Sequence, residues 1–155
     1  MQVTTDAFKD QERIPERYVM PGAGGENVSL PVSWSDPPQE TASFALTMVD
    51  PHPVANNWIH WVVVNIPADV RSIKEGASGQ LMPSRAVELM NSFGKPGYGG
   101  PQPPAGSGEH PYVLTVYALS EANVDPGESP SLSDFMSRID GKVLDKASVT
   151  GVFER

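Results

Sequence analysis

The chain contains three histidines, His52, His60 and His110, and each lies beside a predicted strand or a loop rich in glycine and proline. Imidazole rings donate hydrogen bonds to anions, and so does the hydroxyl of Tyr112, which would share a strand face with His110. Asp50 is a carboxylate able to accept from a histidine and to favour its protonated form. Spacing alone favours independent polar residues at strand edges, whereas their common placement at such junctions indicates a converging pocket.

The same side chains would also serve an enzyme. Asp50, His60 and His110, together with His52, suffice for a mononuclear metal site or for general acid–base hydrolysis. The sequence contains neither His-Glu-x-x-His nor Gly-x-Ser-x-Gly, and the candidate nucleophile Ser107 follows no recognisable triad order. Cysteine is absent, which excludes thiol catalysis, cysteine–zinc sites and disulfides. We therefore expect a binding protein and no enzyme, with a hydrolase or metal-dependent enzyme as the alternative.

Residues 94–110 form a segment of unusual composition, with six glycines and four prolines among 17 residues. The segment leads directly into the strongest predicted strand, whereas a flexible linker would lie between domains. A loop held over a rigid sheet is a frequent place for a binding site. Glycines let backbone N–H groups approach an anion closely, so we expect backbone donors near Gly99 and Gly100.

The elements that must position these residues are mostly strands. Period-two patterns of β-branched and aromatic residues predict three main strands, at residues 43–49, 60–66 and 112–119. Residues 28–34 contain a proline and predict an edge or irregular strand. A short last strand is expected at residues 151–153.

Helix signals are fewer. Residues 83–90 predict a short helix that begins with a proline. Ser131 resembles an N-cap, and apolar residues recur at helical spacing from there to residue 139. Gly141 is expected to interrupt this helix, which would resume for a turn or two over residues 143–147.

Length and charge limit the broad class of the protein. A chain of 155 residues suits a single domain, 1–155. The formal net charge of −8 disfavours nucleic acids and anionic lipid surfaces as partners. No basic and apolar leader is readable, and no apolar run approaches the roughly 18 residues that a membrane span requires. We therefore expect a cytoplasmic protein with no nucleic-acid partner and no membrane span.

Four motifs follow one another in an order that points to a known protein family, and the resemblance covers about residues 8–155. They are Asp50-Pro51-His52-Pro53, Asn57-Trp58-Ile59-His60-Trp61-Val62-Val63-Val64-Asn65-Ile66-Pro67, Gly97-Tyr98-Gly99-Gly100-Pro101-Gln102-Pro103-Pro104-Ala105-Gly106, and His110-Pro111-Tyr112 continuing to Tyr117-Ala118-Leu119. In this order they resemble the phosphatidylethanolamine-binding protein family, also called the Raf kinase inhibitor protein-like family, and most closely its prokaryotic branch.

The resemblance implies a mainly β fold, a β-sandwich of antiparallel sheets with a few short flanking helices, including a C-terminal helical segment. It also implies a small anion-binding pocket at one end of the sandwich, with no metal and no other cofactor. Such a pocket accepts phosphate, acetate, cacodylate or a phosphoethanolamine-like head group. By motif match its residues in this chain would be Asp50, His60, Gly100, Pro101, His110 and Tyr112, with His52 as an additional candidate.

We therefore expect non-enzymatic binding of small anions or phosphorylated head groups, which would be tighter at mildly acidic pH. The resemblance further implies a partner kinase or protease that the protein would modulate, and a homodimer. Among the positions that depart from the family's pattern, His52 stands where a second aspartate is frequent and Pro111 where an arginine is frequent. A surface-mediated inhibitor or scaffold with a vestigial pocket is the remaining alternative.

Overall fold

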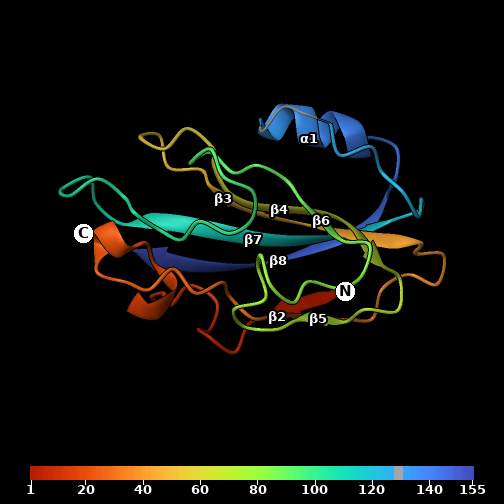
Figure 1. Ribbon diagram of the computed structural model, residues 1–155, viewed down its shortest axis with the longest axis horizontal. Helices are drawn as coiled ribbons and strands as arrows, with labels where there is room; N and C mark the ends of the chain where they lie inside the picture. Colours follow the sequence, from red (N-terminus) through yellow and green to blue (C-terminus); the bar gives the residue numbers. More distant parts are fainter. Residues whose placement is uncertain (128–130) are drawn as a thin grey trace.

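The computed structural model describes residues 1–127 and 131–155, and its strands form two antiparallel sheets packed face to face (Figure 1). The larger sheet has the strand order β6-β4-β3-β7-β8, and the smaller sheet has the order β1-β2-β5. The strands are β1 Gln2–Thr4, β2 Val32–Ser35, β3 Ser43–Asp50, β4 Trp58–Pro67, β5 Ser72–Ile73, β6 Val87–Glu88, β7 His110–Leu119 and β8 Val143–Phe153. This arrangement confirms the antiparallel β-sandwich expected from the sequence.

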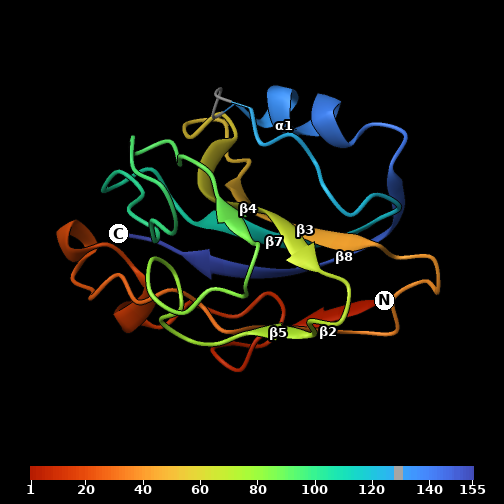
Figure 2. The same ribbon diagram turned by 45° about the vertical axis from the view of Figure 1, so that its right-hand side comes forward.

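The helices of the described chain are short. They are the 3-10 helices η1 Glu16–Tyr18 and η2 Pro21–Ala23, and the α-helix α1 Leu132–Ile139. Helix α1 lies on the outer face of the larger sheet, opposite the smaller sheet (Figure 2). Phe135 and Ile139 of α1 pack there in a second apolar cluster that includes Tyr117 of β7. Within the described residues, no helix has the length and apolar character needed to cross a membrane.

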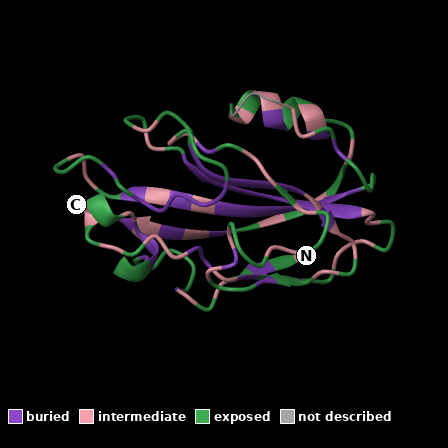
Figure 3. Ribbon diagram, in the orientation of Figure 1, coloured by how far each residue is buried: buried purple, intermediate pink, exposed green. Residues whose placement is uncertain are grey.

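The main core lies between the two sheets, and Figure 3 shows the central strands of the larger sheet buried along most of their length. Trp34 of β2 packs on Phe44 of β3 across this core, with ring centroids 5.3 Å apart. The central strands β3, β4 and β7 are covered on both faces, so their sequences are nearly continuous apolar runs. The strands predicted at residues 43–49, 60–66 and 112–119 are thereby confirmed.

The predictions for the two shorter strands are corrected by the structure. The strand expected within residues 28–34 is Val32–Ser35, and it lies in the centre of the smaller sheet and not at its edge. A central position is compatible with Pro31 because the proline lies just outside the strand and removes no ladder hydrogen bond. The strand expected at residues 151–153 begins already at Val143, because β8 pairs with β7 along its whole length.

Of the helix predictions, the one after Ser131 is confirmed. The Ser131 hydroxyl accepts from the backbone N–H of Asp134 at 3.1 Å and so caps α1. The helical turn predicted at residues 143–147 is wrong, because that segment belongs to β8. The helix predicted at residues 83–90 is also wrong, since the segment forms a loop and β6. A short helix has little stability by itself, and pairing with a neighbouring strand supplies hydrogen bonds to the same backbone groups.

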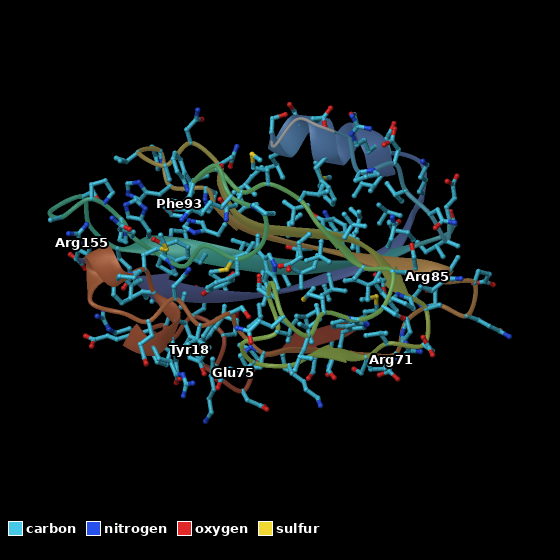
Figure 4. All side chains as sticks on the ribbon, viewed as in Figure 1. Tyr18, Arg71, Glu75, Arg85, Phe93 and Arg155 are labelled. Carbon is cyan, nitrogen blue, oxygen red and sulfur yellow. The ribbon has the colours of Figure 1, made fainter. Side chains whose placement is uncertain are left out.

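The polar residues singled out in the sequence gather at one end of the larger sheet. Asp50 is the last residue of β3, His110 is the first of β7, and His60 is the third of β4. Strand β3 is antiparallel to both neighbours, so its last residues lie beside the first residues of β4 and β7. Phe93 and Arg155 mark this end of the molecule in Figure 4.

Candidate functional site

A cavity of about 230 Å³ lies at this end of the molecule. Four polar side chains meet in it, and we call Asp50, His60, His110 and Tyr112 the floor residues. Each floor residue is at most 3% exposed. The surrounding wall of the cavity is mainly apolar and is formed by Val54, Ala55, Trp58, Phe93, Gln102, Pro103 and Pro104. The cavity therefore combines a buried polar floor with an apolar wall.

A β-bulge in β4 places His60 among the floor residues. Adjacent residues of β3 pair with Trp61 and Ile59, so the intervening His60 has no partner on that strand. Trp61 packs in the core between the sheets, whereas Ile59 packs in the outer cluster under α1. The extra residue of the bulge lets His60 lie on the same side of the sheet as Trp61, which is a common way for a bulge to direct a side chain into a site.

Asp50 and His110 form a buried pair. Oδ2 of Asp50 lies 2.6 Å from Nδ1 of His110, and Oδ1 of Asp50 accepts from the backbone N–H of His52 at 2.9 Å. Ionisable groups in the interior need such bonds, because the loss of water is otherwise not offset. The pair also joins the end of β3 to the beginning of β7.

The hydrogen bonds of Ser107 fix the positions of the His110 protons. Oγ of Ser107 lies 2.6 Å from the Pro104 carbonyl oxygen and 2.9 Å from Nε2 of His110. A carbonyl oxygen only accepts, so the single hydroxyl proton of Ser107 goes to Pro104, and Ser107 accepts from the Nε2–H of His110. A second proton lies between Nδ1 of His110 and the carboxyl group of Asp50. The Asp50–His110 pair therefore carries no net charge.

This proton arrangement does not favour the hydrolase alternative. Ser107, His110 and Asp50 are in contact in the order of a catalytic triad. In such a triad the histidine nitrogen that faces the serine has a free lone pair and removes the serine proton. Here that nitrogen already carries a proton. Among the described residues, no group of three or more histidine, aspartate or glutamate side chains is arranged to hold a metal ion.

His60 is held as a neutral ring. Its Nδ1 donates to the Gly99 carbonyl oxygen at 2.7 Å. Burial lowers the pKa of His60 from 6.5 to about 4, and the opposing effects of the Gly99 backbone and of the Asp50 charge are smaller. At neutral pH the ring therefore carries one proton, on Nδ1, and Nε2 is an acceptor. Among the described residues, Nε2 has no hydrogen bond comparable to that of Nδ1, although the Gly100 backbone also lies near the ring.

The hydroxyl of Tyr112 is buried and has no hydrogen-bond partner in the described part of the chain. Burial, and then the nearby charge of Asp50, raise the pKa of Tyr112 above its usual value, so the hydroxyl keeps its proton. The ring stands edge-on to that of His60, with centroids 5.0 Å apart. Buried hydroxyls are usually satisfied, so an unpartnered one beside a cavity indicates a place that a ligand or water completes.

Two of the sequence candidates, Gly100 and Pro101, do not line the cavity. The N–H of Gly100 donates to Oδ1 of Asn27 at 2.7 Å, and the Pro101 carbonyl accepts a backbone N–H at 3.0 Å. The N–H of Gly99 likewise donates to the carbonyl of His60 at 2.8 Å. The expectation of free backbone donors at Gly99 and Gly100 is therefore wrong, because both N–H groups are already bonded within the protein.

His52, the additional candidate, lies behind the floor and not in the cavity lining. Its ring stacks on the ring of His110 with centroids 3.8 Å apart and an angle of 10° between the planes. Its Nδ1 accepts from the backbone N–H of Val54 at 3.1 Å. The half-buried His52 ring thus covers one face of the Asp50–His110 pair and shields it from water.

Sequence reasoning missed the aromatic part of the wall. Trp58 and Phe93 meet edge to face, with ring centroids 5.4 Å apart. Phe93 is held by Asn91, whose side-chain oxygen accepts the Phe93 N–H at 2.9 Å. A Cβ at Gly99 would lie 2.5 Å from the Phe93 ring, so the glycine makes room for the ring while its carbonyl orients His60. The contacts of Phe93 with Trp58 and of Gly99 with His60 join distant segments, and no periodicity in the sequence signals them.

Comparisons with known proteins agree with this architecture. A family model described as phosphatidylethanolamine-binding protein matches residues 4–154. The chain is 37% identical to the UPF0098 protein YbhB of Escherichia coli, over 99% of each chain. It is 39% identical to a UPF0098 protein of Methanothermobacter thermautotrophicus, over 100% of this chain and 99% of that one. The crystal structure of E. coli YbcL, described as a new member of the mammalian PEBP family, matches 99% of this chain and 98% of its own with a TM-score of 0.91 and 34% identity.

Proposed function

This chain belongs to the phosphatidylethanolamine-binding protein family, and from that premise we propose that its cavity binds small oxyanions, such as phosphate or a phosphorylated head group, without transforming them. One observation carries the proposal: the Tyr112 hydroxyl is buried at the cavity without a partner, and a ligand oxygen would accept its proton. The cavity of about 230 Å³ is several times the roughly 30 Å³ that one water occupies, so it has room for a tetrahedral anion and a small substituent.

The two parts of the cavity would contact different parts of such a ligand. The floor residues would hold the anion, and the aromatic wall at Trp58 and Phe93 would contact the substituent. Aromatic faces attract both carbon groups and ammonium groups, so the wall suits a head group such as phosphoethanolamine. His52 would act as a positioning residue, because it stacks on His110 from outside the cavity. Gly100 and Pro101 would act indirectly, because their backbone hydrogen bonds to Asn27 and Met20 hold the loop that carries Gly99.

Calorimetric titration with phosphoethanolamine at pH 6 tests the proposal. We expect saturable binding by the wild-type protein and at least about tenfold weaker binding by Tyr112→Phe, since a hydrogen bond to a charged group contributes roughly 1.5–3 kcal/mol. Removing an unpartnered buried hydroxyl should leave the melting temperature unchanged or slightly raised.

Tyr117→Phe is the matched control. Tyr117 lies on the same strand but packs in the outer cluster, where its hydroxyl contacts Sδ of Met136. We expect the Tyr117→Phe protein to bind phosphoethanolamine with the same affinity as the wild type. A wild-type protein that melts cooperatively and yet shows no saturable binding would contradict the proposed function.

Three finer expectations accompany the proposal. We propose that the protein is cytoplasmic, that it forms a homodimer, and that the bound anion modulates a partner kinase or protease. Cell fractionation tests the first expectation and sedimentation equilibrium the second. Recovery of a kinase or protease whose activity changes with added phosphoethanolamine would support the third.

A further inference from the structure

The floor offers a ligand one hydrogen-bond acceptor and one donor. The acceptor is Nε2 of His60, because the Nδ1–H of that ring is committed to the Gly99 carbonyl at 2.7 Å. The donor is the unpartnered hydroxyl of Tyr112. The two rings have centroids 5.0 Å apart, so a single tetrahedral or carboxyl group can reach both of them.

The other two floor residues add no free donor. The Nε2–H of His110 is taken by Ser107, and its Nδ1 faces Oδ2 of Asp50. The second carboxylate oxygen of Asp50 accepts from the backbone N–H of His52. Among the described residues that line the cavity there is no lysine and no arginine. The floor therefore presents no unpaired cation to a ligand with two negative charges, because any positive charge on His110 is offset by Asp50.

The charged and titratable groups that face His60 come from two strands. Strand β3 contributes Asp50, and β7 contributes His110 and Tyr112. The neighbouring loop contributes backbone groups, including the Gly99 carbonyl, and one apolar ring. A fully deprotonated ligand oxygen would bring its lone pairs against the lone pair of His60 Nε2, with the Asp50 carboxylate nearby. Such contacts are unfavourable in a site that excludes water.

We infer that the cavity binds its oxyanion in a singly protonated form, in which the ligand's O–H donates to Nε2 of His60 and a second ligand oxygen accepts from Tyr112. The inference rests on the proposed function and specifies the class of ligand. A phosphate monoester qualifies below about pH 6, where it keeps its second proton. A carboxylic acid offers the same pair of groups. A sulfate ester does not qualify, because it carries no proton in this range.

A consequence is that binding takes up a proton whenever the free ligand has none. Above about pH 6 a phosphate monoester is a dianion, so each complex formed must gain one proton from solution. A one-proton linkage changes the affinity by about tenfold per pH unit, which makes a loss of roughly 100-fold between pH 6 and pH 8.

The test compares two matched esters, phosphoethanolamine and ethanolamine O-sulfate, by calorimetric titration of the wild-type protein at pH 5.5 and pH 8. At pH 5.5 we expect the phosphate ester to bind at least about tenfold more tightly than the sulfate ester. At pH 8 we expect phosphoethanolamine to bind on the order of 100-fold more weakly than at pH 5.5. Titrations at pH 8 in two buffers with different heats of ionisation should show uptake of about one proton per bound ligand.

Nuclear magnetic resonance of ¹⁵N-labelled histidine side chains gives a direct readout at His60. In the free protein we expect the tautomer with the proton on Nδ1 and an unprotonated Nε2. Phosphoethanolamine should move the Nε2 signal towards the protonated range, and the sulfate ester should leave it unchanged. In Tyr112→Phe both esters should bind more weakly, while the preference for phosphate persists because His60 is intact.

The two ways of failing are distinguishable. Equal affinity for the two esters at pH 5.5, without proton uptake at pH 8, would overturn the inference and leave the proposed function standing. Failure of both esters to bind a protein that melts cooperatively would overturn the proposed function itself, and the inference with it.

Discussion

At the scale of single residues, the positions of protons in the site are set by two carbonyl oxygens. The Pro104 carbonyl takes the proton of Ser107, which makes His110 donate through Nε2. The Gly99 carbonyl takes the Nδ1 proton of His60, which leaves His60 an acceptor. His110 and His60 therefore have opposite hydrogen-bonding roles at Nε2 in the same cavity. Neither role can be predicted from the residue type alone.

Replacing His110 by alanine would remove the partner of a buried carboxylate. Asp50 would then be left in the interior without its ion-pair or hydrogen-bond partner on Oδ2. We expect His110→Ala to lower the free energy of unfolding by about 3–5 kcal/mol, as is usual when one member of a buried pair is removed. Urea unfolding at pH 7 measures the loss.

A double-mutant cycle separates this pairing from simple loss of packing. In Asp50→Ala/His110→Ala no unpaired carboxylate remains, so the double variant should be more stable than the sum of the two single losses predicts. If the two losses were strictly additive, the two side chains would not be coupled, and the pairing described above would be disproved.

The buried His60 makes stability depend on pH in a defined direction. Its pKa is about 4 in the folded protein against an ordinary value of 6.5, so between these values the unfolded chain binds more protons than the folded one. The stabilisation is fully present above pH 6.5 and is lost as the pH falls towards 4. The loss attributable to this residue is roughly 3 kcal/mol, at about 1.4 kcal/mol per unit of pKa shift.

Urea unfolding at pH 7 and pH 4.5 measures this effect, with His60→Gln as the comparison. Glutamine keeps a side-chain N–H for the Gly99 carbonyl but does not titrate. The decline in stability between the two pH values should therefore be smaller in His60→Gln than in the wild type. An equal decline in both proteins would assign the acid sensitivity to other groups.

At the scale of elements, the loop that precedes β7 supports the site through close backbone packing. A Cβ at Gly100 would lie 2.1 Å from the backbone carbonyl oxygen of Tyr18 and 3.0 Å from Cα of Val19. Backbone atoms cannot move aside as the end of a side chain can. Gly100 is therefore required for packing, which is a different role from the ligand contact that the sequence suggested.

Gly100→Ala should consequently destabilise the fold by about 3 kcal/mol or more, at the upper end of what overpacking usually causes. Gly22→Ala is the matched control, because the atoms nearest to a Cβ there belong to the exposed side chain of Gln102, which can move. Thermal melting of the two variants measures the difference, and we expect the lower melting temperature for Gly100→Ala. Similar melting temperatures for both would mean that Gly100 is not packed as tightly as the distances indicate.

The elements that could be predicted from the sequence are those whose own residues decide their structure. Strands β3, β4 and β7 are covered on both faces, and their sequences are therefore continuous apolar runs. The start of α1 is marked in the sequence by its N-cap residue, Ser131. Residues 83–90 and 143–147 have helical spacing over too few residues to be decisive. Their structure is set by pairing with β4 and β7, which a local pattern does not reveal.

At the scale of the whole molecule, the floor is assembled from residues that are far apart in the chain. Asp50 and His110 are 60 positions apart, and His60 and Gly99 are 39 apart. The contacts that complete the cavity therefore exist only when the larger sheet and its loops are in place. Ligand binding should therefore act on the stability of the whole fold.

Phosphoethanolamine should accordingly raise the melting temperature of the protein. A ligand at 100 times its dissociation constant stabilises the folded state by about 2.7 kcal/mol. For a chain of this length that corresponds to a rise of roughly 5–11 °C, at about 2–4 °C per kcal/mol. The same concentration should shift Tyr112→Phe by clearly less. A wild-type shift no larger than that given by ethanolamine alone would indicate that the phosphate group is not bound.

The identity of the floor residues was accessible from the sequence, whereas their hydrogen-bonding state was not. Asp50, His60, His110 and Tyr112 lie together because antiparallel pairing brings the strand ends that carry them to one edge. The proton positions depend on Ser107 and on two carbonyl oxygens, and therefore on loop geometry. The bulge at His60 and the packing of Phe93 against Gly99 likewise depend on tertiary contacts, so no local residue pattern predicts them.

The division of the cavity into a floor built by strand ends and a wall built largely by loops has a consequence for how such proteins diversify. Loops tolerate changes of length and residue that strands in a shared core do not. Substitutions within residues 53–57 or 92–94 can therefore alter which substituent is accepted while the recognition of the acid group stays the same. A protein engineer seeking a new ligand should randomise these two loops and keep the strands, and each resulting variant should inherit the same dependence on proton uptake.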